Sequence, residues 1–281
     1  LTRKLSSYSS LTRKFEGDSG RRDFDAIMNQ PPILEDEEAI AERFKLPKGS
    51  KTGIFFHEIL EELDFKITDD SILKKLISEK LQKYRLDEDY SETVEEIVKN
   101  TLQADLGFGL TLNRLPWEQR ISEMEFYFPV KTGQVTDLVK SLGRLTSSEE
   151  TNSFISTLES LDFKLVAGFM KGYIDLVFSH NNRYYILDWK TNHLGNQFEN
   201  YQPDTLARYI NRHSYNLQFY IYALALHKYL SGKIPDYDFS KHFGGVCYLF
   251  LRGISGEGQT GIYYNDLKTS EEILVQMDHF F

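Results

Sequence analysis

Two neighbouring apolar runs each carry an acidic side chain, and a lysine closely follows the second acid. They occur in the stretch KGYIDLVFSHNNRYYILDWK. Asp175 lies inside the first apolar run, and Asp188 directly follows the second. Two carboxylates on adjacent strands repel each other unless a cation or a basic group lies between them. Lys190 is two residues after Asp188, so both side chains point to the same face of an extended chain.

This stretch is typical of a β-hairpin. Its apolar runs, 173–178 and 184–187, are rich in β-branched and aromatic residues, which favour strands. Asn181 and Asn182 stand between the runs, and asparagine tolerates the positive φ of a tight turn. The hairpin therefore predicts a compact cluster of two acids and one lysine.

Such a cluster suits phosphoryl chemistry. Two carboxylates can hold Mg²⁺ and leave room for water and a phosphate oxygen. The ion lowers the pKa of bound water and polarises the phosphoryl group. A neighbouring lysine orients or deprotonates the attacking water, or neutralises charge on the phosphate. Taken alone, the D-x-K triplet favours two surface acids beside a strand-end lysine. The aliphatic neighbours weaken that interpretation, because unpaired acids are rarely placed among buried residues.

The segment GYIDLVF…RYYILDWKTNHLG resembles the nuclease signature of the PD-(D/E)XK superfamily, in its RecB-like form. The likeness covers almost the whole chain, and the motifs occur in the same order. They are SSYSSL, GIFFHEILEELDF, EMEFYFP, YNLQFYIYALALHKYL and DYDFSKHFGGVCYLFLRG. The resemblance implies an α/β fold with a restriction-endonuclease-like core, in which helices flank a small mixed β-sheet and the active site lies at one edge.

A histidine in an early predicted helix is open to two interpretations. His57 stands among apolar neighbours, where a lone histidine is more often a core residue than a ligand. HEILEE is not the zinc-protease HExxH, because Glu61 stands where the second histidine is needed. The resemblance implies that His57 is a metal ligand. Glu61, one turn later, either supports the site from outside or is a solvated acid.

A strongly apolar helix predicted from Tyr215 to Leu230 contains the last motif. Gln218 and Tyr222 are four residues apart and share one face of this helix. On their own they indicate an ordinary buried amide and aromatic. They match the QxxxY motif of RecB-like nucleases, and the resemblance implies that they orient the substrate.

The resemblance also completes a ligand set. It implies that His57, Asp175 and Asp188, with the Trp189 backbone carbonyl, hold Mg²⁺, and that Mn²⁺ or Ca²⁺ can occupy the same site. It implies that Lys190 positions or activates water. The sequence departs from the expected pattern in Trp189 and Thr191, where Tyr and Ser are usual.

The alternating pattern of residues 121–130 predicts a strand. Either Glu123 or Glu125 could approach the site, but the solvent face of the strand is the favoured interpretation. Amphipathic patterns predict helices in 70–105, 134–163 and 270–280. Two further strands are expected in the remaining apolar runs, at 242–251 and 259–264.

Composition limits the remaining possibilities. The chain has 281 residues, 41% of them hydrophobic, and one cysteine, Cys247. A disulfide within the chain and a four-cysteine iron–sulfur cluster are therefore excluded. The lack of a disulfide fits a reducing cytoplasm, and the resemblance implies a bacterial one. No apolar run reaches about 18 residues, so no transmembrane helix is expected. Without a G-x-x-x-x-G-K-[ST] motif the chain does not supply its own ATP-driven motor.

Charge and the first residues point to a part of a larger assembly. The net charge of −9 counts against DNA binding, so the distribution of basic residues matters more. The first 22 residues carry a basic cluster of Arg3, Lys4, Arg13, Lys14, Arg21 and Arg22. The chain begins without Met, and we expect it to be a piece of a longer protein. Residues 1–50 are predicted to be an arm or linker, with a flexible tail equally compatible for 1–30, and 51–281 the nuclease domain.

The acid, acid, lysine cluster and the resemblance together predict a Mg²⁺-dependent nuclease that hydrolyses DNA phosphodiesters, and the resemblance implies the exodeoxyribonuclease V type. The resemblance implies action on single- and double-stranded DNA ends, in double-strand break resection and recombinational repair. It also implies partners: the helicase region of the same polypeptide, and RecC-like and RecD-like subunits. The alternative is a catalytically silent module that binds DNA or partner subunits. Retention of His57 and of the acid, acid, lysine cluster favours the enzyme.

Overall fold

The structure is a computed structural model that describes most of the chain. The described residues are 4–12, 40–66, 69–145, 148–161, 164–165, 167–256, 258–268 and 270–281. Most of the predicted basic cluster lies outside them, namely Arg3, Arg13, Lys14, Arg21 and Arg22. That cluster therefore stays a prediction.

A mixed β-sheet forms the centre of the molecule. Its order is β1-β5-β6-β7-β8, and β2 pairs along the other side of β5. The strands are β1 (Lys4–Ser6), β2 (Arg120–Val130), β5 (Gly168–His180), β6 (Arg183–Lys190), β7 (Phe243–Phe250) and β8 (Ile262–Asn265). The β1–β5 and β6–β7 pairs are parallel and the others antiparallel. β3 (Gly133–Gln134) and β4 (Lys164–Leu165) form a separate small ladder.

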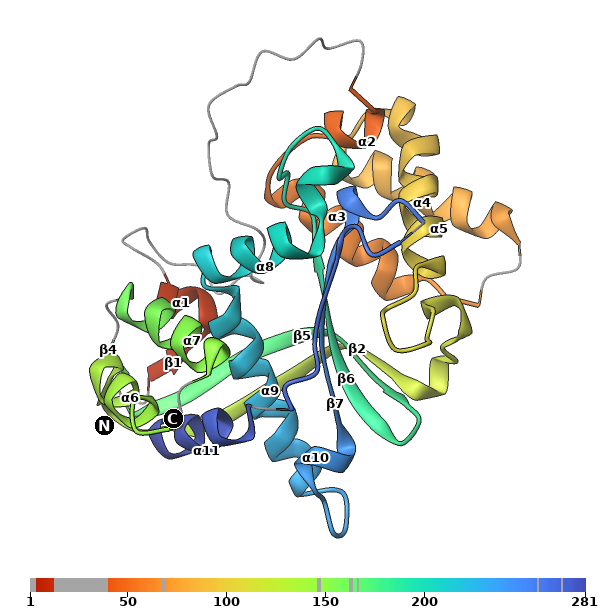
Figure 1. Ribbon diagram of the computed structural model, residues 1–281. Helices are drawn as coiled ribbons and strands as arrows, with labels where there is room; N and C mark the ends of the chain where they lie inside the picture. The colour runs from red at the N-terminus through yellow and green to blue at the C-terminus, as the bar shows by residue number, and fades with distance from the viewer. Residues whose placement is uncertain are drawn as a thin grey trace.

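Helices cover both faces of this sheet (Figure 1). One face packs against α6 (Val135–Leu142), α7 (Glu149–Glu159), α8 (Pro203–Arg212), α9 (Tyr215–Ser231) and α11 (Glu271–Phe280). The opposite face packs against α3 (Ser50–Glu62), α4 (Asp70–Tyr84) and α5 (Ser91–Gln103). Short helices are α1 (Tyr8–Thr12), α2 (Glu42–Lys45) and α10 (Phe239–His242). The predicted α/β fold, a small mixed sheet flanked by helices, is confirmed.

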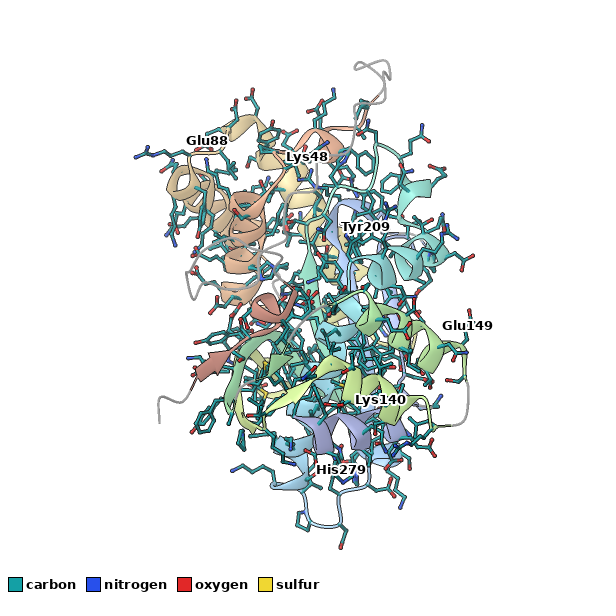
Figure 2. All side chains as sticks on the ribbon, turned by 90° about the vertical axis from the view of Figure 1, so that its left-hand side faces the viewer. Lys48, Glu88, Lys140, Glu149, Tyr209 and His279 are labelled. Atoms are coloured by element: carbon teal, nitrogen blue, oxygen red, sulfur yellow. The ribbon has the colours of Figure 1, made fainter. Side chains whose placement is uncertain are left out.

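α3–α5 lie toward one end of the molecule, and α6 and α11 lie toward the other (Figure 2). In Figure 2, Glu88 and Lys48 mark the end that carries α3–α5, and Lys140 and His279 mark the other. α9 is buried around most of its circumference because nearly every residue in its first three turns is apolar. In the described part of the chain, none of the helices combines the length and apolar character needed to cross a bilayer.

The predicted hairpin is present as β5 and β6. Asn181 and Asn182 have φ of 48° and 60°, the left-handed values of a two-residue I′-type turn. From this turn the antiparallel pairing runs from His180 opposite Arg183 to Leu176 opposite Leu187. The strands then separate, and the two acids of the sequence motif stand just beyond the last pair.

The side-chain alternation of β5 is interrupted where its pairing with β6 ends. Ile174 packs on the α9 side, whereas Leu176 packs on the α3 side. Residues two apart in a regular strand share a face, so the alternation is broken between them. Opposite the break, Glu123 of β2 has a left-handed φ of 51°. The local distortion in both strands lies where the Glu123 and Asp175 side chains approach each other.

Segments before residue 50 take part in this packing. β1 adds to the edge of β5, and the Tyr8 hydroxyl donates to the Ser214 carbonyl at 3.2 Å. Arg43 is buried and donates to the Ile254 carbonyl at 2.6 Å. The domain boundary at residue 50 stays a prediction, because contacts of this kind do not define a boundary.

The fully buried guanidinium of Arg252 connects the residues after β7 to Thr191 and to residues 43–47. Arg252, only 1% exposed, donates to four backbone carbonyls. The acceptors are Thr191 (2.9 Å), Arg43 (3.1 Å), Leu46 (3.0 Å) and Pro47 (2.7 Å). Carbonyl acceptors satisfy the guanidinium donors, which would otherwise be costly to bury. The residues just after Lys190 are thereby fixed to the segment that leads into α3.

Candidate active site

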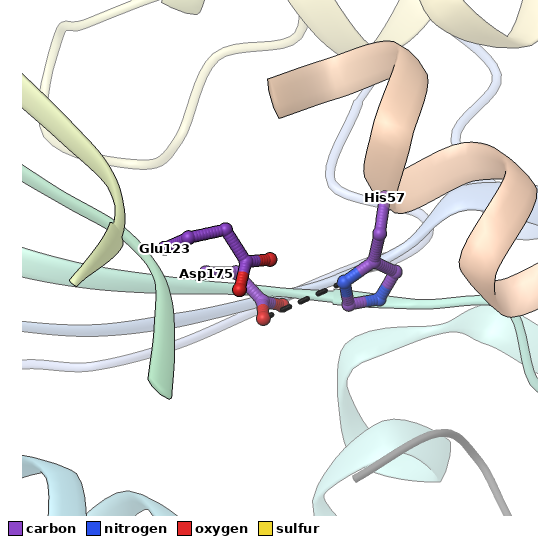
Figure 3. Close-up of side chains that lie close together, drawn as sticks. All are labelled: His57, Glu123 and Asp175. Atoms are coloured by element: carbon purple, nitrogen blue, oxygen red, sulfur yellow. Dashed lines mark ion pairs between the residues drawn. The ribbon is translucent and has the colours of Figure 1, made fainter. Parts of the chain in front are cut away.

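The candidate site lies where β5 and β6 separate. Asp175 of β5 and Asp188 of β6 each stand one residue beyond the last pair of the hairpin. On the other side of β5, Ser122 pairs with Leu176 and Met124 with Ile174, so Glu123 lies opposite Asp175. α3 supplies His57 from above this point (Figure 3).

Three side chains form a group with metal-ligand spacing. One ligand atom each from His57, Glu123 and Asp175 lies within 4.8 Å of the other two. His57 Nδ1 is 3.5 Å from Asp175 Oδ1, and a dashed line marks this pair in Figure 3. His57 Nε2 is 3.0 Å from the Trp189 carbonyl oxygen. In the neutral ring, a proton on Nε2 donates to that carbonyl and leaves the Nδ1 lone pair facing two carboxylates. When Nδ1 is protonated as well, the charged ring pairs with Asp175. Such a cluster is repulsive until a cation or a proton joins it.

Asp188 is paired with the lysine of the motif. Asp188 Oδ2 lies 2.6 Å from Lys190 Nζ, and each side chain is only 3% exposed. Lys190 also donates to Gln218 Oε1 at 3.1 Å. Its Nζ stands 4.4 Å and 4.9 Å from the ring centres of Tyr215 and Tyr248. The ammonium is therefore held among a carboxylate, an amide and two aromatic faces.

The two acids have opposite pKa shifts. Burial and the nearby Asp175 charge raise the pKa of Asp188 to about 7, against the lowering effect of Lys190. Burial also raises the pKa of Asp175, but the charge and hydrogen bond of His57 outweigh it, helped by Lys190 and the Trp189 amide. The net pKa of Asp175 is lowered. The Trp189 N–H donates to Asp175 Oδ2 at 2.8 Å. Unequal environments of this kind are typical of functional carboxylates.

The residues fit a hard divalent cation. Asp188 Oδ2 is buried and lacks a well-aligned hydrogen bond from the described residues, and its partner there is the Lys190 ammonium at 2.6 Å. The ammonium offsets part of the cost of burying this carboxylate, and a divalent cation beside it would offset more. Together the donors are one imidazole nitrogen and carboxylate oxygens, a set that suits Mg²⁺ or Mn²⁺. Asp188 is not in the group of three, so its role as a ligand, like that of the Trp189 carbonyl, stays a prediction.

The predicted motif on α9 lies behind the lysine. Gln218 Nε2 donates to the Tyr222 hydroxyl at 3.2 Å, and the Tyr248 hydroxyl donates to Gln218 Oε1 at 2.7 Å. Gln218 and Tyr222 are 1% and 4% exposed. In this structure Gln218 contacts Lys190 from the interior, and Tyr222 contacts Gln218. Their predicted contact with substrate stays a prediction.

The sequence did not favour Glu123, which the structure places in the group. Alternation along β2 assigned it to the solvent face, and the left-handed φ that redirects it leaves no signal in the pattern. Glu125, the other candidate, is exposed and contacts Lys171 and Tyr173 instead. Glu61 is partly buried on α3, and its supporting role stays a prediction.

The sheet, its flanking helices and this acid, acid, lysine site define the class of protein. A family model described as PD-(D/E)XK nuclease superfamily matches residues 33–277. The chain belongs to the PD-(D/E)XK nuclease superfamily.

The chain is also similar to curated bacterial proteins called RecBCD enzyme subunit RecB. It is 34% identical to that of Escherichia coli (strain K12) over 284 residues, 99% of this chain and 23% of the relative. It is 39% identical to that of Buchnera aphidicola subsp. Schizaphis graminum over 74% of this chain and 17% of the relative. For Haemophilus influenzae the identity is 34%, over 84% of this chain and 19% of the relative. The chain thus spans less than a quarter of the length of these relatives.

Proposed function

We propose that this chain is the Mg²⁺-dependent nuclease domain of a RecBCD-type helicase–nuclease and hydrolyses phosphodiester bonds in DNA. The convergence of His57, Glu123 and Asp175 beside the Asp188–Lys190 pair carries the proposal. Membership of a nuclease superfamily and likeness to RecB subunits support it.

His57, Glu123 and Asp175 would hold a divalent cation at this site, and Asp188 would add a further oxygen from the neighbouring strand. When bound, the cation would act as a Lewis acid toward a phosphate oxygen and lower the pKa of water. Water attacks phosphorus and releases a proton to solvent, a new P–O bond forms, and the bond from phosphorus to the leaving sugar oxygen breaks as that oxygen takes up a proton. The Lys190 ammonium, fixed by Gln218, orients the attacking water or offsets charge that develops on the phosphate.

The proposal includes the setting of the reaction. The relatives are named as subunits of the RecBCD enzyme, so we expect a helicase region in the same polypeptide and RecC-like and RecD-like partner subunits. Single- and double-stranded DNA ends would be the substrates, in break resection and recombinational repair. Bacterial relatives are consistent with a bacterial cytoplasmic location.

Linear, end-labelled single-stranded DNA tests the proposal. The purified chain should cut it weakly in Mg²⁺ and not in EDTA, and cleavage should fall as salt screens phosphate contacts. Equal cleavage in Mg²⁺ and EDTA would overturn the metal mechanism. Binding without cleavage in any divalent ion would favour the catalytically silent alternative.

A further inference from the structure

The face of β5 that carries the site continues along the strand as a row of exposed or half-buried side chains. Phe169, Lys171 and Tyr173 lie at intervals of two residues and share one face of β5. Asp175 stands at the break in the alternation, and its contact with His57 of α3 places it on the same side of the sheet. The intervening Met170 and the nearby Ile174 are buried in the core on the opposite side. In Figure 1 the paired β2 and β5 extend away from α3–α5 toward β1. The row therefore leads out from the active site.

β2 contributes a matching row. Tyr127 pairs with Lys171, and Glu125 pairs with Tyr173. Residues directly opposite each other in an antiparallel pair point to the same face. The next residues on β2, Phe126 and Phe128, are buried in the core, which confirms the direction of Tyr127. We define the aromatic strip as Tyr127, Phe169, Lys171 and Tyr173.

The strip exposes aromatic surface to solvent. Tyr127 is 70% exposed, and its ring meets that of Phe169 at 5.8 Å and 66°. Phe169 and Tyr173 are half-buried. Lys171 Nζ stands 5.4 Å from the centre of the Tyr173 ring. Contiguous exposed aromatic rings beside an ammonium are a feature of binding surfaces rather than of ordinary strand edges.

One acid holds part of the strip in place. Glu125 accepts a hydrogen bond from the Tyr173 hydroxyl at 3.1 Å and forms an ion pair with Lys171. The ring and the ammonium are thus ordered before any ligand arrives. Ordering beforehand lowers the conformational entropy that binding must remove.

We propose that the aromatic strip binds single-stranded DNA next to the active site, with bases stacked on the rings and a phosphate near Lys171. This rests on the proposed function. Same-face positions are about 6.6 Å apart, so the strip reaches about 20 Å from Asp175 to Phe169. Every base has a π-face, and a single strand leaves these faces free to stack. A duplex buries the faces of its bases and is bound mainly through many phosphate contacts. The strip has only one ammonium, Lys171, to make such contacts, so it suits a single strand better.

Fluorescence anisotropy with labelled oligodeoxythymidine of 20 nucleotides, in EDTA to prevent cleavage, measures this binding. Tyr127→Ala should weaken it at least about fivefold, the loss expected for one stacked base. Tyr127→Trp should restore it, because the larger ring still stacks. Tyr229→Ala is the matched control, since Tyr229 is also an exposed tyrosine (43%) but lies on α9 outside the strip. It should leave binding unchanged.

A second oligonucleotide separates stacking from charge. An abasic strand of equal length keeps the phosphates and lacks the bases. Tyr127→Ala should therefore not change the affinity of the protein for this strand. Lys171→Gln should reduce the slope of log affinity against log salt by about 0.7, one phosphate contact on a single strand. Lys75→Gln, which removes another surface lysine of an ion pair, should leave the slope unchanged.

The outcomes distinguish the two proposals. A parent chain that neither binds nor cuts DNA overturns the proposed function and the strip with it. A parent that cuts in Mg²⁺, with Tyr127→Ala binding oligodeoxythymidine as tightly as the parent, overturns the strip alone. That result would assign the exposed rings to protein contact. Equal losses for the abasic and the normal strand would also overturn stacking.

Discussion

Asp188 Oδ2 lies 2.6 Å from Lys190 Nζ in a position where each side chain is only 3% exposed. A buried pair of this kind is worth little to stability, because both ions lose their hydration. Its location at the end of the β5–β6 hairpin indicates a chemical role instead. The pair keeps an ammonium and a carboxylate oxygen beside the group of His57, Glu123 and Asp175.

Asp188→Ala should abolish cleavage while DNA binding survives or tightens. The variant loses a carboxylate oxygen next to the metal group, and one negative charge near the phosphate. We expect a loss of roughly 10²-fold or more, as for other key catalytic groups. Product release from labelled single-stranded DNA and filter binding on the same preparations measure both effects. Retention of a tenth of the parental turnover would place the chemistry elsewhere.

The double variant Asp188→Ala with Lys190→Ala should be little worse than Asp188→Ala alone. Residues that act as one unit lose most of their effect when the first is removed. The same cleavage assay gives the comparison. Additive losses would mean that the two side chains contribute independently.

His57→Ala should weaken Mn²⁺ binding more than it disturbs folding. An imidazole ligand favours Mn²⁺ over the harder Mg²⁺, so Mn²⁺ should stimulate the parent or partly rescue the variant. Calorimetric titration with Mn²⁺, beside thermal unfolding, measures both properties. His279→Ala removes an exposed histidine on α11 and serves as the control. Unchanged affinity in a folded variant would make His57 a core residue.

Glu123→Gln should weaken Mn²⁺ affinity roughly 10-fold or more, as expected when a metal site loses part of its support. The amide keeps the size of the side chain and removes the charge that faces His57 and Asp175. Glu118→Gln, at an exposed position preceding the same strand, is the control. Parental affinity in Glu123→Gln would remove Glu123 from the site.

Stability should depend on the ionisation of Glu58. Burial raises its pKa, but hydrogen bonds from Lys83, Tyr84 and Lys80 more than offset this and lower the pKa to about 2. A carboxyl with a lowered folded-state pKa stabilises the protein above the usual pKa, 4.5 here. That stability is lost as pH falls from about 4.5 toward 2.

Glu58→Gln should therefore lower the free energy of unfolding at pH 7 by on the order of 1 kcal/mol, with allowance for solvent screening. The difference from the parent should shrink below pH 4.5. Urea unfolding at pH 7, 4.5 and 3.5 provides the measurement. Glu79→Gln, whose side chain is 61% exposed, should have little effect at any of these pH values. A constant difference across the range would contradict the pKa shift.

The sequence predicted the hairpin well because its information is local. Asn181 and Asn182 define the turn, and the apolar runs beside them define the strands. For the same reason, amphipathic periodicity predicted the helices at 70–105, and a continuous apolar run predicted the helix of Gln218. These patterns do not depend on the rest of the chain.

The contribution of Glu123 could not be predicted in the same way. Its side chain approaches His57 and Asp175 because β2 and β5 change direction together where the pairing with β6 ends. Likewise, Tyr248 and Gln218 lie 30 residues apart and meet only after β7 and α9 pack. Long-range packing of this kind leaves no periodic signal in the sequence.

The hydrogen bonds from the Arg252 guanidinium to residues 43–47 form late in the synthesis of the chain. The acceptors at Arg43 and Leu46 precede Arg252 by 209 and 206 residues. At about 5–20 residues per second, the ribosome makes those carbonyls roughly 10–40 s before it makes their donor. Residues 43–47 therefore form their hydrogen bonds with Arg252 only near the end of chain synthesis. A stalled polypeptide that ends within β7 has its sheet hairpin but lacks these hydrogen bonds.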